Sequence, residues 1–122
     1  MAQDYKHGIP AVSPIASIIA AATGTLVHTL PATRTCRARK IHIFNHNAAT
    51  ANVSLGTGLA GLFVPAMVAW QVLAGMDLIV EVGQIPDFEF TANVTASSNV
   101  AGAAPANVEI QIEVEEYLGT AG

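Results

Sequence analysis

Alternation of apolar and polar residues is the feature that most constrains the fold of this chain. The clearest run covers residues 108–115, where four apolar side chains alternate with four polar ones: Val108, Ile110, Ile112 and Val114 against Glu109, Gln111, Glu113 and Glu115. Successive side chains of a β-strand point to opposite faces, so this period predicts a strand with one buried and one exposed face. The same period recurs over 76–82 and 88–96, and we predict strands there too.

Weaker patterns predict further strands. They cover residues 25–30, 35–44, 51–56, 62–64 and 68–73. Within the second of these, the apolar phase slips by one residue after Ala38, which a β-bulge near Arg39 or Lys40 would absorb. Residues 15–22 fit a strand or a short helix, because their alanines favour a helix while their isoleucines fit either period.

Turn signals separate the predicted strands at short intervals. They lie at residues 31–32, 45–47, 56–58, 65–66, 74–75, 83–86 and 97–105. Such spacing is typical of an all-β sandwich or barrel. We predict a single antiparallel β-sandwich, jelly-roll-like, with about eight strands. The bulky core residues should be Phe63, Trp70, Phe88 and Phe90.

The length of 122 residues fits one domain. Residues 1–14 carry two prolines and a glycine without any periodicity. We therefore expect residues 1–14 to be an extended N-terminal arm without secondary structure, held by a neighbouring chain or by a groove on its own domain. Residues 15–122 should then form the β-sandwich domain.

The composition favours association with other proteins. Hydrophobic residues make up 52% of the chain but charged residues only 11%, against about 25% in an average soluble domain. A surface with so little charge suits burial against neighbours, so we expect an oligomer or a subunit of a larger assembly.

The longest apolar run, 15–23, is shorter than the roughly 20 residues that cross a bilayer, and no basic segment precedes it. We therefore expect no membrane partner and synthesis in the cytoplasm.

Four histidines raise the question of a metal site, but zinc or iron needs three or four converging ligands. A cupin-type jelly roll would place two histidines one residue apart with a glutamate soon after, whereas no glutamate follows His42 before Glu81. We expect the histidines to be structural, with a metal-binding or pH-sensitive contact at a subunit interface as the alternative.

The single Cys36 allows neither an internal disulfide nor a thiolate cluster, and we expect it in the core.

The sequence holds no pattern typical of an enzyme. The carboxylates of 87–89 and 109–115 alternate along predicted strands, which is typical of a solvated or paired sheet face rather than of catalytic carboxylates in a pocket. The glycines of 56–58 are not followed by the lysine and helix that a phosphate loop requires. We therefore expect no catalytic residues, no cofactor and no metal.

Two stretches resemble a known class of proteins. They read TLVHTLPATRTCRARKIHIFNHNAATANVSLGTG and FVPAMVAWQVLAGMDLIVEVGQIPDFEFTANVTASS, with turn and strand motifs at Thr29–Ala32, Asn45, Ala51–Leu55, Leu73–Gly75 and Phe90–Ser97. Over residues 24–117 the chain resembles the small β-sandwich structural proteins of tailed bacteriophages, which include head-decoration and other virion accessory proteins. The resemblance supplies no catalytic motif. It implies self-association, commonly as trimers or larger rings, and contact with a capsid or tail surface.

The expected function is that of a non-enzymatic capsid decoration (cement) protein that self-associates and stabilises the phage head. Its partners would be copies of itself and the major capsid protein or other virion proteins, in a virion assembled in the host cytoplasm. One alternative is a head-to-tail connector, tail accessory or receptor-binding subunit. Another is a carbohydrate-binding module, for which Tyr117 is the best candidate to stack on a sugar.

Charge is unevenly placed along the chain. The net charge of −4 argues against nucleic acid as a partner, yet four of the five basic residues lie within 34–40 and four glutamates within 109–116. The favoured hypothesis is that Arg37 and Arg39 pair with the carboxylates of 109–115, across strands or across a subunit boundary. Alternatively, they contact an acidic capsid face. The candidate interface residues come from the arm, the basic cluster and the carboxylate row: Tyr5, Lys6, His7, Arg37, Arg39, Lys40, Glu109, Glu113 and Glu115.

Overall fold

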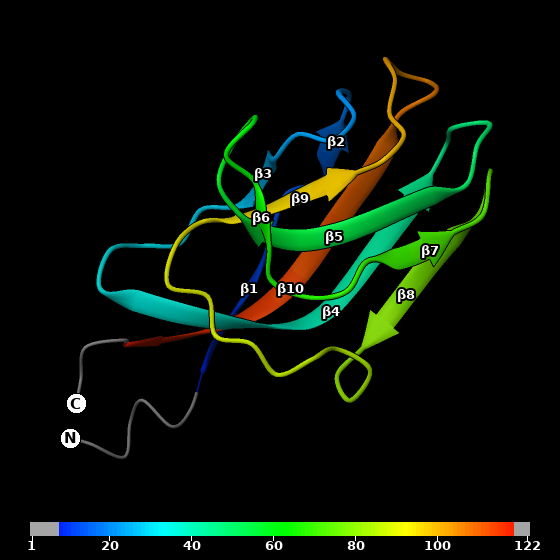
Figure 1. Ribbon diagram of the computed structural model, residues 1–122. Helices are drawn as coiled ribbons and strands as arrows, with labels where there is room; N and C mark the ends of the chain where they lie inside the picture. The colour runs from blue at the N-terminus through cyan, green and yellow to red at the C-terminus, as the bar shows by residue number, and fades with distance from the viewer. Residues whose placement is uncertain (1–7, 119–122) are drawn as a thin grey trace.

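The computed structural model describes residues 8–118 and contains ten strands over that range (Figure 1). They are β1 (Ile9–Val12), β2 (Ala16–Ile18), β3 (Thr25–His28), β4 (Arg34–Asn45), β5 (Ala51–Thr57), β6 (Val64–Pro65), β7 (Trp70–Val72), β8 (Asp77–Glu81), β9 (Val94–Ser98) and β10 (Val108–Leu118). The described residues include no helix that could span a bilayer.

The strands form two antiparallel sheets. One has the order β1-β10-β4-β8 with β2 also on β10, and the other has the order β3-β9-β5-β6 with β7 also on β5. Because β4 pairs with β10 along its whole length, β1 and β2 share the opposite edge of β10 as one interrupted strand. In the same way, β6 and β7 share one edge of β5.

Counting each interrupted strand once gives eight positions in the described chain. Their order is 1-8-3-6 in the first sheet and 2-7-4-5 in the second, which is the order of a jelly roll built from two Greek keys. In the projection of Figure 1, the long β4 and β10 of the first sheet cross β5 and β9 of the second. The predicted all-β sandwich is therefore confirmed.

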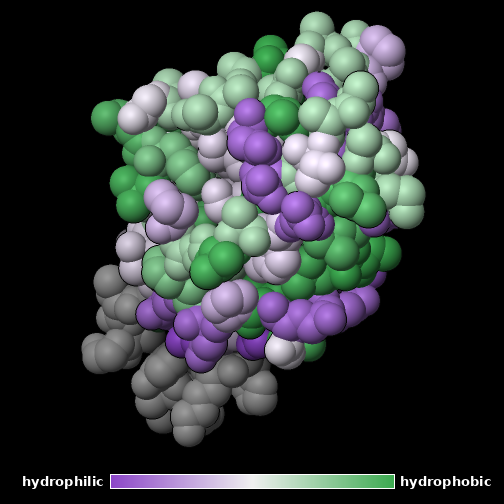
Figure 2. All heavy atoms as spheres, turned by 45° about the vertical axis from the view of Figure 1, so that its right-hand side comes forward, coloured by the Kyte–Doolittle hydropathy of each residue, from purple (hydrophilic) through white to green (hydrophobic). Residues whose placement is uncertain are grey.

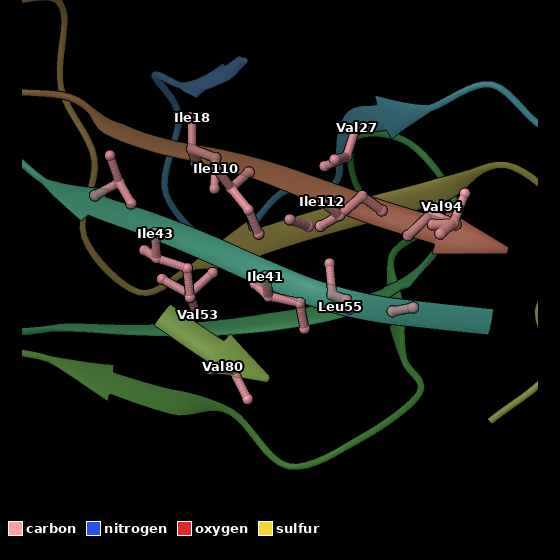
Figure 3. Packing of buried hydrophobic residues seen from close by; sticks show 14 of the residues in the cluster. Ile18, Val27, Ile41, Ile43, Val53, Leu55, Val80, Val94, Ile110 and Ile112 are labelled. Atoms are coloured by element: carbon pink, nitrogen blue, oxygen red, sulfur yellow. The ribbon is translucent and has the colours of Figure 1, made fainter. Parts of the chain in front are cut away.

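The core lies between the two sheets and consists mainly of branched aliphatic side chains (Figure 3). Fully buried examples come from the three long strands β4, β5 and β10: Ile41, Ile43, Val53, Leu55, Ile110 and Ile112. Cys36 is also fully buried, as expected. Of the four predicted aromatic core residues only Phe90 is buried, since Phe88 is 38% exposed and Phe63 and Trp70 are half-buried. Aliphatic side chains occupy most of the inner faces instead.

The predicted bulge in β4 is present. Glu113 of β10 lies opposite Lys40, and the next residue, Val114, lies opposite Ala38, so Arg39 is the extra residue. The bulge lets Ala38 and Ile41 both face the core despite their spacing of three residues. The apolar phase slip in the sequence therefore has a structural cause.

The strand predicted over 88–96 is wrong for residues 88–93. Only Val94–Ser98 forms a strand, β9, and residues 82–93 form a loop whose backbone pairs with β4 at one bridge, between Cys36 and Phe90. This loop carries the chain from β8 in one sheet to β9 in the other. Backbone that crosses between sheets must leave both ladders, so the alternation in this segment does not produce a strand.

The prediction of an arm without secondary structure is wrong for residues 9–12, which form β1 and pair with β10. The sandwich therefore includes these residues rather than beginning at residue 15. Ser13 donates its backbone N–H to the carbonyl of Ile112 at 2.9 Å. Backbone groups alternate in direction along a strand, so the nitrogen atoms of Pro10 and Pro14, which carry no hydrogen, point away from β10 toward solvent. An edge strand tolerates proline in this orientation. Residues 1–7 of the predicted arm lie outside the described residues.

Residues 15–22, for which a strand and a short helix were both open, contain the three-residue strand β2 followed by a turn. Ile18 of β2 is fully buried, whereas Ile15 and Ile19 are exposed. These residues form a strand rather than a helix because their backbone pairs with the otherwise free edge of β10.

Candidate interaction surface

The basic cluster and the C-terminal carboxylates meet at one end of the sandwich. Because β4 and β10 are antiparallel neighbours, the start of β4 lies beside the end of β10, with Arg37 opposite Glu115 and Arg34 opposite Leu118. Residues about 80 positions apart in sequence thus become cross-strand neighbours. The predicted arginine and carboxylate pairing can therefore form within one chain.

Arg39, Glu115 and Tyr117 form a hydrogen-bonded cluster on this end. The Arg39 Nε donates to Glu115 Oε1 at 2.6 Å, and the Tyr117 hydroxyl donates to the same oxygen at 2.7 Å. The Arg39 Nη2 also donates to the Tyr117 oxygen at 3.0 Å. The hydrogen bonds from Tyr117 and then Arg39 hold the pKa of the Glu115 carboxyl below its usual value. The Arg39–Glu115 pair is one that the sequence predicted.

Arg37 pairs with a different partner from the one predicted. Its guanidinium forms a salt bridge with Asp87 of the loop between β8 and β9, not with the carboxylates of 109–115. The hydrogen bond to Asp87 raises the pKa of the Arg37 guanidinium. Lys40, the third predicted basic residue, lies opposite Glu113 of β10 and opposite Glu81 of β8 in the register of the sheet.

A buried ionic cluster that was not among the predicted sites lies nearby. The Arg34 Nη1 donates to Glu116 Oε1 at 2.7 Å, and the His28 Nε2 lies 2.7 Å from Glu116 Oε2. Glu116 is only 4% exposed. The alternation contained the signal, because Glu116 continues the inward phase of Ile112 and Val114 and so replaces the next apolar residue.

The two other described histidines lie on the outer face of the first sheet. The His42 Nε2 is 3.0 Å from Asp77 Oδ2, and the His46 Nε2 is 2.9 Å from Glu109 Oε1. The Phe44 ring lies between them, with ring centroids 3.9 Å from His42 and 6.3 Å from His46. Residues 8–118 contain no group of three or more side chains that could hold a metal ion.

An open groove of about 770 Å³ lies beside the Arg37 and Arg39 ion pairs. Its floor comes from the start of β4 and the end of β10, and its wall comes from the loop over residues 82–89. The groove mixes charged and apolar side chains, among them the Arg37–Asp87 pair, Phe88 and Tyr117. Of the predicted interface residues, Arg37 and Arg39 line it, while Tyr5, Lys6 and His7 fall outside the described residues.

Large apolar side chains are also exposed. One group follows the interrupted edge of the first sheet and consists of Ile9, Val12, Ile15 and Ile19. Another lies on the segment that carries β6 and consists of Leu59, Leu62, Val64 and Val68. Figure 2 shows one face of the molecule, on which hydrophobic residues in green lie between narrower hydrophilic patches in purple. The low charge is visible in the sequence, but the positions of these two groups are not, because their segments show only weak alternation or none.

A scan against protein-family models matches no family, and no curated protein matches the chain. One solved structure with a detectable likeness is described as the cyanophage Pam1 capsid asymmetric unit. The alignment covers 91% of this chain and 86% of that chain, with 16% sequence identity and a TM-score of 0.39. Similarity this weak does not assign a function to this chain.

Proposed function

We propose that this chain is a non-enzymatic structural protein of a bacteriophage virion, which decorates the capsid and stabilises the head. The observation that supports the proposal best is the surface of the jelly roll. Fifteen large hydrophobic side chains are exposed among residues 8–118, whereas the whole chain has only fourteen charged residues. Eight of the fifteen belong to the two groups described above, and exposed apolar groups of this kind usually mark a site of protein association.

The arrangement of these side chains supports contacts on more than one side. The edge carrying Val12 and Ile15 belongs to the first sheet, and the segment carrying Leu62 and Val68 lies at the edge of the second. A subunit with two apolar surfaces can bind a copy of itself through one and a capsid subunit through the other. Contacts that are weak singly become strong when symmetry repeats them over a shell.

The basic residues support a protein partner over nucleic acid. Arg34, Arg37 and Arg39 are engaged with carboxylates of the same chain. Binding to a phosphate backbone needs several cations that are free to replace counterions. The paired arginines are better suited to fixing the end of the sandwich than to binding nucleic acid.

The decisive experiment locates the protein on purified particles of the phage that encodes it. Mass spectrometry should detect the chain in virions, and imaging of tagged particles should place it at regular positions on the head. Heads assembled without it should break at a lower temperature, and adding the purified protein should restore their stability. Its absence from purified virions would contradict the proposal, while density on the tail would assign it to a tail or connector role.

The groove favours a second candidate, a carbohydrate-binding role. Tyr117 and Phe88 supply aromatic surface beside the hydrogen-bonding side chains of Arg37 and Asp87, and sugar sites combine these two kinds of group. A glycan array separates the candidates when it is combined with light scattering after size-exclusion chromatography. A monomer that binds a glycan, and loses that binding on Tyr117→Ala, would favour the second role. A stable oligomer without glycan binding would favour the first.

A further inference from the structure

The two edges of the first sheet differ in their ability to accept another strand. On the edge formed by β1 and β2, the solvent-facing positions include Pro10 and Pro14, which have no N–H to donate. Proline on an edge is a common protection against pairing with another chain. The opposite edge is β8, which has five residues and no proline.

The register of β8 shows which of its backbone groups face outward. The Asn45 N–H donates to the carbonyl of Met76 at 2.9 Å, so by the antiparallel alternation Leu78 and Val80 also exchange hydrogen bonds with β4. The N–H and C=O groups of Asp77 and Ile79 must then point away from β4. No hydrogen bond among residues 8–118 uses the outward backbone groups of Ile79.

The end of β8 is closed by its own turn. The Gln84 side chain accepts a hydrogen bond from the Glu81 N–H at 3.2 Å, and the Gln84 N–H donates to the Glu81 carbonyl at 3.0 Å. The open stretch is therefore short and centred on Ile79. Its side chain is 44% exposed.

The side chains around Ile79 determine what kind of strand fits. Asp77 and Glu81 lie two residues to either side, on the same face of the sheet. On the occupied side of β8, the strand β4 places Lys40 opposite Glu81, and His42 contacts Asp77. A strand on the open side would face the same two carboxylates and would need cations at the corresponding positions.

A second copy of β8 does not meet this requirement. Antiparallel pairing about a two-fold axis at Ile79 would place the aspartate of each copy opposite the glutamate of the other. Like charges directly opposite each other destabilise a strand pair. The charges thus oppose self-pairing at this edge and favour a basic partner.

We propose that the β8 edge binds an extended segment of another protein in which an apolar residue is flanked, two positions away on each side, by lysine or arginine. Main-chain hydrogen bonds would provide affinity and the alternate side chains specificity, as in other cases of strand addition. Such binding does not depend on the proposed virion role and requires only that the chain be folded.

The test uses the full chain and a synthetic peptide, acetyl-Gly-Lys-Val-Ile-Val-Lys-Gly-amide, with a control peptide in which both lysines are replaced by glutamate. Titration followed by two-dimensional amide NMR should show saturable binding of the basic peptide, with the largest shifts at residues 77–81. The acidic peptide should bind at least tenfold more weakly. Equal binding of both peptides, no saturable binding of the basic one, or shifts confined to another edge would overturn the proposal.

Variants test the geometry. Ile79→Pro removes the outward N–H but no hydrogen bond to β4, so it should fold and lose at least tenfold in peptide affinity. The matched Ile79→Thr keeps the N–H and should retain binding. Should the proline variant prove unfolded, the double variant Asp77→Lys with Glu81→Lys should instead reverse the preference between the two peptides, and an unchanged preference would refute the inference.

Discussion

The Nε2 atom of His28 lies 2.7 Å from Oε2 of Glu116, and this contact joins the second sheet to the first at the end of the sandwich where β1 begins and β10 ends. Arg34 contacts the other carboxylate oxygen. A buried carboxylate needs such partners, because removing one member of a buried ionic cluster leaves the others without compensation.

Replacing the buried carboxylate should therefore destabilise the fold. Glu116→Gln leaves Arg34 and His28 facing a neutral amide, and we expect a loss of about 3 kcal/mol in the free energy of unfolding. Urea denaturation followed by circular dichroism measures it. The matched control is Glu109→Gln, which removes an exposed contact with His46 and should cost less than about 0.5 kcal/mol. Equal costs for the two variants would show that burial of the cluster contributes nothing.

Glu115 should make stability depend on pH in the acid range. Its folded pKa lies below the usual 4.5 because Tyr117 and Arg39 donate hydrogen bonds to the carboxylate. A group with a lowered folded pKa stabilises the protein fully above its unfolded pKa, and the stabilisation is lost as the pH falls through the folded value. Melting temperatures from pH 7 to 3 should thus fall less steeply for Glu115→Gln than for the native protein. An unchanged slope would contradict the assignment.

Gly56 is required by close contact between backbones. A Cβ atom at this position would overlap the carbonyl oxygen of Val64, which belongs to the neighbouring strand β6. Gly56→Ala should therefore push β6 away and cost about 2 kcal/mol or more, measured by thermal or urea unfolding. Gly61→Ala is the matched control, since nothing lies within 4 Å of its Cβ and little change is expected.

Thr95 offers a substitution that should stabilise the protein. Its side chain is 1% exposed, and its hydroxyl has no hydrogen-bond partner among the described residues. A buried polar group without a partner carries a desolvation cost that an apolar group of the same shape avoids. Thr95→Val should raise the free energy of unfolding by about 1 kcal/mol. A decrease would mean that the hydroxyl has a partner, such as a bound water, in solution.

Much of the fold could be predicted because its strands are half-buried. The alternation over 108–115 and 76–82 reports one inner and one outer face, and the phase slip in β4 reports the bulge at Arg39. The segment 88–93 alternates equally well but carries the chain between sheets, and periodicity does not distinguish these cases. The strand β1 was missed since its prolines suit an edge only once β10 supplies the partner.

The candidate surface was predictable to a smaller extent. Pairing of Arg39 with Glu115 follows from opposite charges on two long strands that turned out to be neighbours. The partner of Arg37 does not follow from the sequence, because Asp87 lies beside a segment predicted as a strand, whereas in the structure it belongs to a loop that folds over the start of β4. Long-range loop contacts of this kind leave no periodic signal in a sequence.

The pairing of Ile9 with Glu116 has a practical consequence for engineering. The first and last described strands run antiparallel side by side, so a circular permutant in which a short linker joins residue 118 to residue 8 would leave every described ladder intact. New termini would open at the exposed residues 103–106, at the other end of β10. A fluorescent or affinity label attached there would stand away from the groove and from the ion pairs of Arg34, Arg37 and Arg39. The groove end of the molecule would then stay accessible to whatever binds it.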